Sequence, residues 1–130
     1  MNPKRRGSQY EAAFVTQALK RGLDILEPYG DYMPYDVMVQ NADGRIQRVQ
    51  VKGTGSQIKG KPGYKIVAAS GNTTKVPLSP DAVDVLAAYV ELEDTWYLIP
   101  AKKLNGNVSV YLNPHSKVNG RYEVWKEAWN

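Results

Sequence analysis

Two short stretches joined by a tight turn constrain the fold of this chain most. Residues 35–40 and residues 46–52 each place branched or aromatic side chains at alternate positions, which is typical of β-strands. The link from Asn41 to Gly44 favours a three-residue loop with glycine in the left-handed conformation. That loop predicts an antiparallel hairpin in which Asn41 faces Arg45, so that paired residue numbers add up to 86. A loop of two or four residues would shift the register by one position.

In this register Asp36 faces Gln50, and Lys52 lies two residues further along the same strand face. Cross-strand partners have Cβ atoms about 5 Å apart, so the three side chains would form one group. Aspartate is disfavoured inside strands, yet Asp36 interrupts an apolar run. Each residue alone could be an ordinary polar residue at a strand end or on an exposed face. Their convergence favours a functional site, because a carboxylate, an amide and a lysine suit an ion bound beside a phosphate.

An acidic residue on a predicted first helix belongs to the same argument. Ser8 to Glu11 has the form of a capping box, which predicts a helix that starts there and ends at Gly22. Glu11 in that position has an ordinary structural explanation as a capping residue. At helical spacing it also falls on the apolar face, where a carboxylate needs a partner. That partner could be an arginine, or a metal ion beside Asp36.

The remaining chain predicts a mixed α/β architecture. A short strand is expected at 23–26, a loop at 29–34, a glycine- and lysine-rich surface loop at 53–63, strands at 64–69, 83–92, 95–99 and 108–112, irregular structure at 70–80, and a closing helix at 122–129. A helix, then strands, then a helix indicates layers around a mixed sheet.

Composition narrows the functional classes. The 130 residues are enough for one domain with a single core. The chain has no cysteine and one histidine, His115, which excludes disulfides, thiolate metal sites and multi-histidine sites. No apolar run is long enough to span a membrane, and no signal-peptide core follows the basic start, so we expect a cytoplasmic protein. The net charge of +4 is compatible with a polyanionic partner.

The order of these residues resembles the PD-(D/E)XK nuclease superfamily. Its pattern is an acidic residue on a first helix, then Pro-Asp, then (Asp/Glu)-x-Lys on the next strand; Glu11, Asp36 after Pro34, and Gln50-Val51-Lys52 match that order. The chain is similar to the branch with Gln-x-Lys, which includes small bacterial and phage nucleases and a cyanobacterial intron-encoded homing endonuclease. The likeness covers roughly residues 8 to 104. Archaeal Holliday junction resolvases share the core more distantly.

The chain departs from the family pattern at two positions. One residue separates Pro34 from Asp36, and Gln50 replaces the second acidic residue of the strict motif. A neutral amide removes one negative charge from a metal site. Mg²⁺ can still be held by one or two carboxylates with water and substrate phosphate, so Glu11 would matter more. A decayed, non-cleaving nucleic-acid-binding domain is the alternative.

The resemblance implies a fold and an activity. The fold would be α/β with a restriction-endonuclease-like core: a mixed central β-sheet flanked by helices (αβββ-αβ type), in one nuclease domain over residues 1–130. The activity would be that of a Mg²⁺-dependent DNA endonuclease, with Mn²⁺ as a substitute and double-stranded or branched DNA as substrate. We expect a site-specific, homing-type enzyme acting as a homodimer or higher homo-oligomer, with a structure-specific resolvase as the alternative.

The resemblance also assigns roles to residues. Glu11, Asp36 and the Val51 carbonyl would be metal ligands, Lys52 would act as a cation that orients the attacking water, and Gln50 would bind that water or the metal. The basic residues expected to contact DNA are Lys4, Arg5, Arg6, Lys59, Lys61 and Lys65. These lysines could equally serve only to keep a surface loop solvated. The aromatic residues Tyr122, Trp125 and Trp129 could form a subunit interface or pack on the sheet.

Overall fold

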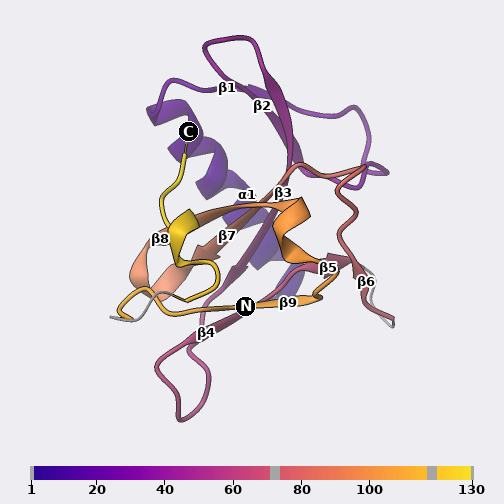
Figure 1. Cartoon of the computed structure of the whole chain (residues 1–130). Helices are drawn as coiled ribbons and strands as arrows, with labels where there is room; N and C mark the ends of the chain where they lie inside the picture. The colour runs from indigo at the N-terminus through magenta and orange to yellow at the C-terminus, as the bar shows by residue number, and fades with distance from the viewer. Residues whose placement is uncertain (1, 71–73, 117–119, 130) are drawn as a thin grey trace.

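A five-stranded mixed sheet forms the centre of the molecule (Figure 1). The computed structural model describes residues 2–70, 74–116 and 120–129. The strands lie in the order β1 (Asp24–Leu26), β2 (Val37–Gln40), β3 (Ile46–Thr54), β7 (Val85–Val90) and β8 (Thr95–Pro100). β3 and β7 run parallel, and the other neighbours are antiparallel. The sheet is therefore mixed, as the sequence predicts.

The two faces of this sheet are covered differently. Helix α1 (Pro3–Lys20) covers one face, and an antiparallel pair, β4 (Tyr64–Val67) and β9 (Ser109–Leu112), covers the other. Along β7, Val85 and Ala87 pack toward α1, while Leu86, Ala88 and Val90 pack toward β4 and β9. β7 is thus apolar on both faces, which explains its nearly continuous run of apolar residues. A small pair, β5 (Ala69–Ser70) and β6 (Val76–Pro77), completes the strands of the described residues.

The register of the β2–β3 hairpin is the predicted one. Val37 pairs with Val49 and Gln40 with Ile46, so every pair adds up to 86. The Asn41 N–H donates to the Arg45 carbonyl at 2.9 Å, and Gly44 has a φ of 88°. This is the left-handed conformation that glycine adopts without steric cost, so the turn residues fix the pairing.

Helix α1 begins earlier than the sequence pattern predicts. Its N-cap is Asn2, whose Oδ1 accepts the Lys4 N–H at 2.8 Å, and Pro3 is the first helical residue. The predicted helix start at Ser8 is therefore wrong. Asparagine followed by proline is itself a strong signal for a helix start. The helix ends as predicted, with the Leu23 N–H donating to the Ala18 carbonyl at 3.0 Å beyond the turn.

The prediction of a closing helix at 122–129 is also wrong. A single 3₁₀ turn, η3 (Glu123–Trp125), is followed by a one-residue bridge at Lys126 and a turn at Glu127, whose φ is 53°. Lys126 forms a bridge to Tyr97 of β8, and the Glu127 N–H donates to the Trp96 carbonyl at 2.7 Å. The open edge of β8 thus provides backbone partners that outcompete helix formation in a short segment. Among the described residues, α1 is the one α-helix, and strands β4 and β9 cover the sheet face opposite to it.

Smaller differences concern element ends. The strand expected at 64–69 is divided into β4 and β5, and residues 53–54 continue β3 instead of opening the loop. The run expected as one strand at 83–92 gives β7 and a 3₁₀ turn, η1 (Glu91–Glu93). Another 3₁₀ turn, η2 (Ala101–Leu104), follows β8. No helix within the described ranges has the length and apolar character to cross a membrane.

Candidate active site

The candidate site lies where β3 extends beyond the start of β2. The last β2–β3 pair is Val37 with Val49, followed by the Asp36 N–H donating to the Val49 carbonyl at 2.9 Å. β3 continues to Thr54, alongside β7 on its other side. The N-terminal half of α1 packs beside this part of β3, with Tyr10 against Gly53. An open pocket results, which we call the α1–β3 pocket; it is lined by Pro3, Arg6, Gly7, Tyr10, Glu11, Asp36, Gln50, Val51, Lys52 and Gly53. All five residues predicted for catalysis and metal binding therefore line one pocket.

Asp36 is held by two hydrogen bonds from β3. Its Oδ2 accepts the Val51 N–H at 2.8 Å and the Gln50 side-chain amide at 3.1 Å. The carboxylate thus replaces the strand partner that Val51 lacks beyond the start of β2. Burial raises the pKa of Asp36 above its ordinary value, although the Val51 N–H and the Lys52 charge oppose the increase.

Two neutral oxygens complete the β3 side of the pocket. Because the Gln50 amide donates through its nitrogen to Asp36, its carbonyl oxygen is left to accept a bond or to bind a cation. The Val51 N–H points to the side that β2 leaves open. In an extended strand the carbonyl of a residue points to the same side as its N–H, so the Val51 carbonyl is directed to this open edge.

Glu11 approaches the same group from the helix. The pKa of Glu11 is raised, first by burial and then by the negative charges of Asp36 and Glu27, while the Lys52 charge lowers it. The two carboxylates are thus close enough to repel each other. Within the described part of the chain, no group of three Asp, Glu, His or Cys side chains is arranged to hold a metal ion. The donor set is therefore two partly desolvated carboxylates and two neutral oxygens, which fits a hard divalent cation that keeps several waters.

Tyr10 is a residue of this pocket that sequence reasoning missed. Its ring lies directly on the backbone of Gly53, where an added Cβ would be 2.6 Å from two ring carbons. Its hydroxyl donates to Glu91 Oε1 at 2.7 Å. Burial, followed by this bond to the carboxylate, raises the pKa of Tyr10 to about 12. A glycine directly after Lys52 in a strand was the available signal, because such glycines mark close approach of another group.

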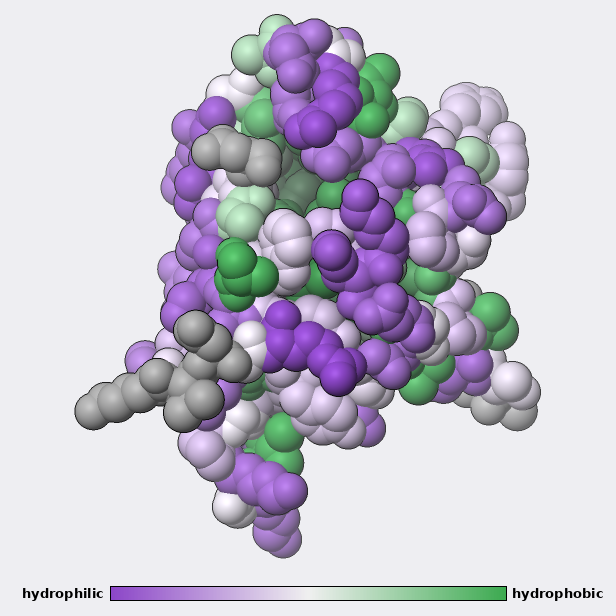
Figure 2. Space-filling model, in the orientation of Figure 1, coloured by the Kyte–Doolittle hydropathy of each residue, from purple (hydrophilic) through white to green (hydrophobic). Residues whose placement is uncertain are grey.

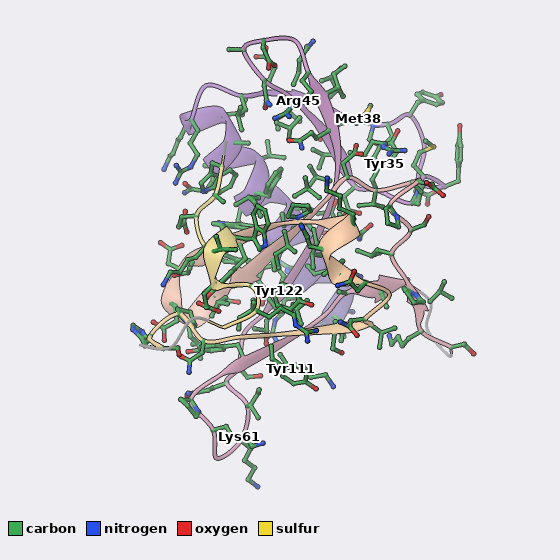
Figure 3. All side chains as sticks on the ribbon, in the orientation of Figure 1. Tyr35, Met38, Arg45, Lys61, Tyr111 and Tyr122 are labelled. Atoms are coloured by element: carbon green, nitrogen blue, oxygen red, sulfur yellow. The ribbon has the colours of Figure 1, made fainter. Side chains whose placement is uncertain are left out.

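The predicted DNA contacts are spread over three elements. Lys4 and Arg5 are exposed in the first turn of α1, and Arg6 lines the α1–β3 pocket. The exposed residues Lys59 and Lys61 lie in the loop 55–63, Lys61 at its projecting tip (Figure 3), and Lys65 is exposed on β4. Of the six, only Arg6 is brought to the pocket.

The aromatic residues near the C-terminal end pack on the sheet. Tyr122 is buried in the core between the sheet and the β4–β9 pair, with Trp125 packed against it. The Trp129 ring stacks on Phe14 at 5.6 Å between centroids and lies edge-on to Trp96 at 6.1 Å. Of the two interpretations of these residues, the structure therefore supports packing on the sheet.

Comparisons with known proteins bear on the fold and the family of the chain. The chain is similar to the solved structure of a bacterial homing endonuclease, I-Ssp6803I, with a TM-score of 0.83 and 24% sequence identity over 99% of this chain and 91% of that one. At this identity the likeness shows a shared fold. Comparison with curated protein sequences finds no match. A family model described as PD-(D/E)XK endonuclease matches residues 1–130. The chain therefore belongs to the PD-(D/E)XK endonuclease family.

Proposed function

We propose that this endonuclease cuts DNA with Mg²⁺, at a specific site in the manner of a homing enzyme. The observation that carries the proposal is the convergence of Glu11 of α1, Asp36 just before β2, and Lys52 of β3 on the α1–β3 pocket. The site-specific, homing-type assignment is supported by the likeness to I-Ssp6803I. Mn²⁺ would substitute for Mg²⁺, and the whole of residues 1–130 would act as one nuclease domain.

The chain's own residues would hold and orient the reactants. Glu11, Asp36 and the Val51 carbonyl would bind the cation, and a bound Mg²⁺ would supply Lewis acidity and neutralise charge at the phosphate. Lys52 would act as a cation that orients the attacking water and places positive charge near the reacting phosphate. Gln50 is fixed through its amide nitrogen by Asp36, so its oxygen would accept a hydrogen bond from that water.

The first test is cleavage of a randomised duplex library and a synthetic four-way junction, with Mg²⁺ and with EDTA. We expect wild-type cleavage that requires the metal and is lost in Asp36→Ala and Lys52→Ala, while DNA binding by Lys52→Ala is largely retained. Lys103→Ala is the matched control, because Lys103 is exposed on η2, which lies outside the pocket. Full activity of Lys52→Ala would refute the assignment.

The substrate that is cut defines the subclass. One long duplex site would identify a homing-type enzyme, and four-way junctions cut whatever their sequence would identify a resolvase. DNA binding without cleavage of either substrate would favour the decayed domain, with Gln50 as the mark of lost chemistry.

Cleavage of both strands by one pocket per chain would require pairing of chains, so we also propose a homodimer or higher homo-oligomer. Sedimentation velocity of the free protein and of its DNA complex would test this, and a monomer in both states would contradict it.

A further inference from the structure

The β4–β9 pair forms a two-stranded ribbon with one buried and one free face. Its register places Tyr64 opposite Leu112 and Ile66 opposite Val110, and these four side chains are at most 3% exposed. Because side chains alternate across a strand, the two other pairs, Lys65 with Tyr111 and Val67 with Ser109, face away from the core. We call these four residues the outer face of the ribbon. Tyr111 is 62% exposed there, although it is a large aromatic residue.

The outer face continues into a shallow hollow lined by Asn107, Ser109, Tyr111, Arg121 and Tyr122. The outer face and the hollow together carry two cationic side chains, one amide, several hydroxyl groups and the methyl groups of Val67. No residue of the outer face or the hollow is acidic. The exposed lysines of the loop 55–63 lie nearby in sequence. In Figure 3, Tyr111 and Lys61 lie on the same lower side of the molecule, and Figure 2 shows hydrophilic residues at the loop tip. The charge of this surface is complementary to a polyanion.

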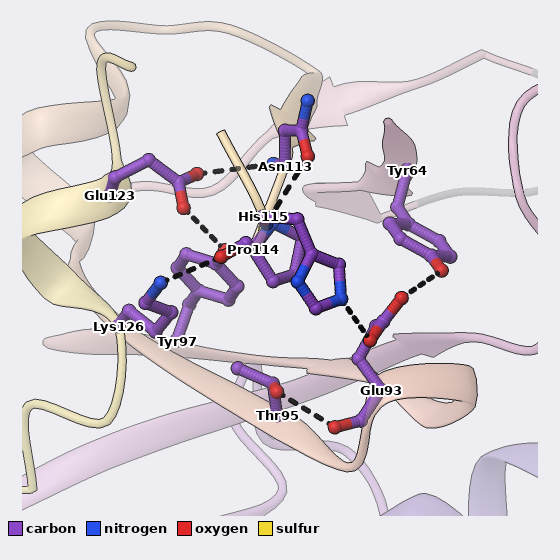
Figure 4. A network of polar contacts seen from close by, with 9 residues as sticks. All are labelled: Tyr64, Glu93, Thr95, Tyr97, Asn113, Pro114, His115, Glu123 and Lys126. Carbon is purple, nitrogen blue, oxygen red and sulfur yellow. Dashed lines mark hydrogen bonds and ion pairs between the residues drawn. The ribbon is translucent and has the colours of Figure 1, made fainter. Parts of the chain in front are cut away.

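Two carboxylates behind the ribbon accept hydrogen bonds from tyrosine hydroxyls of the core (Figure 4). Glu93 Oε2 accepts the hydroxyl of Tyr64 at 2.8 Å, and its Oε1 contacts His115 Nε2 at 2.6 Å. Glu123 Oε1 accepts the hydroxyl of Tyr97 at 2.7 Å. Tyr64 and Tyr97 are both buried, so these acids support the ribbon from the core side.

The dimensions of the ribbon fit the DNA major groove. Two strands lie about 4.8 Å apart, and the major groove, about 12 Å wide, admits a two-stranded ribbon. Four residues per strand extend over about 10 Å, which corresponds to about three base pairs. The side chains are of the types that contact base edges: arginine bonds to guanine, asparagine to adenine, serine to either, and valine contacts the thymine methyl group.

We propose that the outer face of the β4–β9 ribbon reads base sequence in the major groove of the DNA that this enzyme cuts. The inference rests on the proposed function, which it deepens by assigning sequence recognition to a surface separate from the α1–β3 pocket. Arg121, Asn107 and Ser109 would contact base edges. Lys65 and the loop 55–63 would contact phosphates and so fix the register of the ribbon on the duplex.

The test is selection of bound duplexes from a randomised library by the full chain in EDTA, so that binding is measured without cleavage. Wild type should enrich a preferred sequence. We expect Arg121→Ala to lose discrimination at one base pair by about 5- to 150-fold. Lys65→Ala should weaken binding to all sequences alike and lower the salt slope by about one. Lys103→Ala serves as the matched control, and circular dichroism confirms that each variant is folded.

Two outcomes overturn the proposal. Preferences that are unchanged in Arg121→Ala, Asn107→Ala and Ser109→Ala would show that the ribbon does not read bases, even if wild type cuts DNA with Mg²⁺. Wild-type binding without any sequence preference would do the same. By contrast, altered preferences in a protein that never cleaves DNA would support the ribbon and refute the proposed catalytic function, so the two failures are distinguishable.

Discussion

Gly53 is the position where one added methyl group should report on how α1 docks against β3. Gly53→Ala would place a Cβ 2.6 Å from Cδ2 and Cε2 of the Tyr10 ring. The ring has little freedom to move, because its hydroxyl is bonded to Glu91 at 2.7 Å and the residue is 6% exposed. Overpacking of this kind costs about 1–3 kcal/mol. Alanine is better than glycine in a strand by about 0.5–1 kcal/mol, so we expect a net loss of about 1 kcal/mol.

A second substitution isolates the cause. In a Tyr10→Ala background, the ring that the new methyl group meets is absent, so Gly53→Ala should become stabilising by about 0.5–1 kcal/mol. The effect of the same substitution thus changes sign, which corresponds to a coupling free energy of about 2 kcal/mol between the two positions. Tyr10→Ala alone should cost about 3 kcal/mol or more, because it removes a buried aromatic ring.

Urea unfolding of the four proteins at one pH measures the cycle. The midpoints should change while the slope of unfolding free energy against urea stays constant. Cleavage assays of the same proteins should show a higher Mg²⁺ requirement for Gly53→Ala, since Glu11 follows Tyr10 directly on the helix. An equal loss of stability from Gly53→Ala in both backgrounds would refute the contact as its cause. A neutral effect in the wild type would refute the close approach itself.

Two further predictions concern stability away from the pocket. Arg48 donates to Asp84 through Nε at 2.9 Å and Nη2 at 3.0 Å, and this pairing holds the pKa of Asp84 below its ordinary value. An unfolded aspartate titrates near pH 3.9, so the contribution is fully present above that pH and is lost as the pH falls through the lower folded pKa. Asp84→Asn should therefore lower the free energy of unfolding by about 1 kcal/mol at pH 7. The difference in unfolding free energy between this variant and wild type, measured with urea, should shrink below about pH 4. A difference that stays constant with pH would contradict this. Trp129→Ala removes a ring that packs against both Phe14 and Trp96, so we expect a loss of about 2 kcal/mol and a weaker near-UV circular dichroism signal. An unchanged melting temperature would contradict the packing.

The local patterns of the sequence determined the hairpin and the end of the first helix. Asn41 and Gly44 set the turn, and the turn set the pairing of Asp36 with Gln50, because register in a short hairpin depends on the loop alone. Gly22 marked the end of α1 for a similar reason, since the left-handed conformation there is a property of one residue. The order of the acidic residues and Lys52 was sufficient to identify the family.

Tertiary structure decided what depends on partners distant in the sequence. The segment 122–129 has a pattern compatible with a helix, but the free edge of β8 and the core around Tyr122 hold it as a 3₁₀ turn followed by a single bridge to β8. The docking of α1, which brings Glu11 to Asp36, depends on Tyr10 resting on Gly53. A glycine inside a strand can mark a close approach, but no local pattern tells which distant residue makes it. The outer face of the β4–β9 ribbon exists only because two strands more than forty residues apart pair over one core. Such contacts are set by long-range packing, whose free energy is shared among many residues and is not carried by any short stretch of sequence.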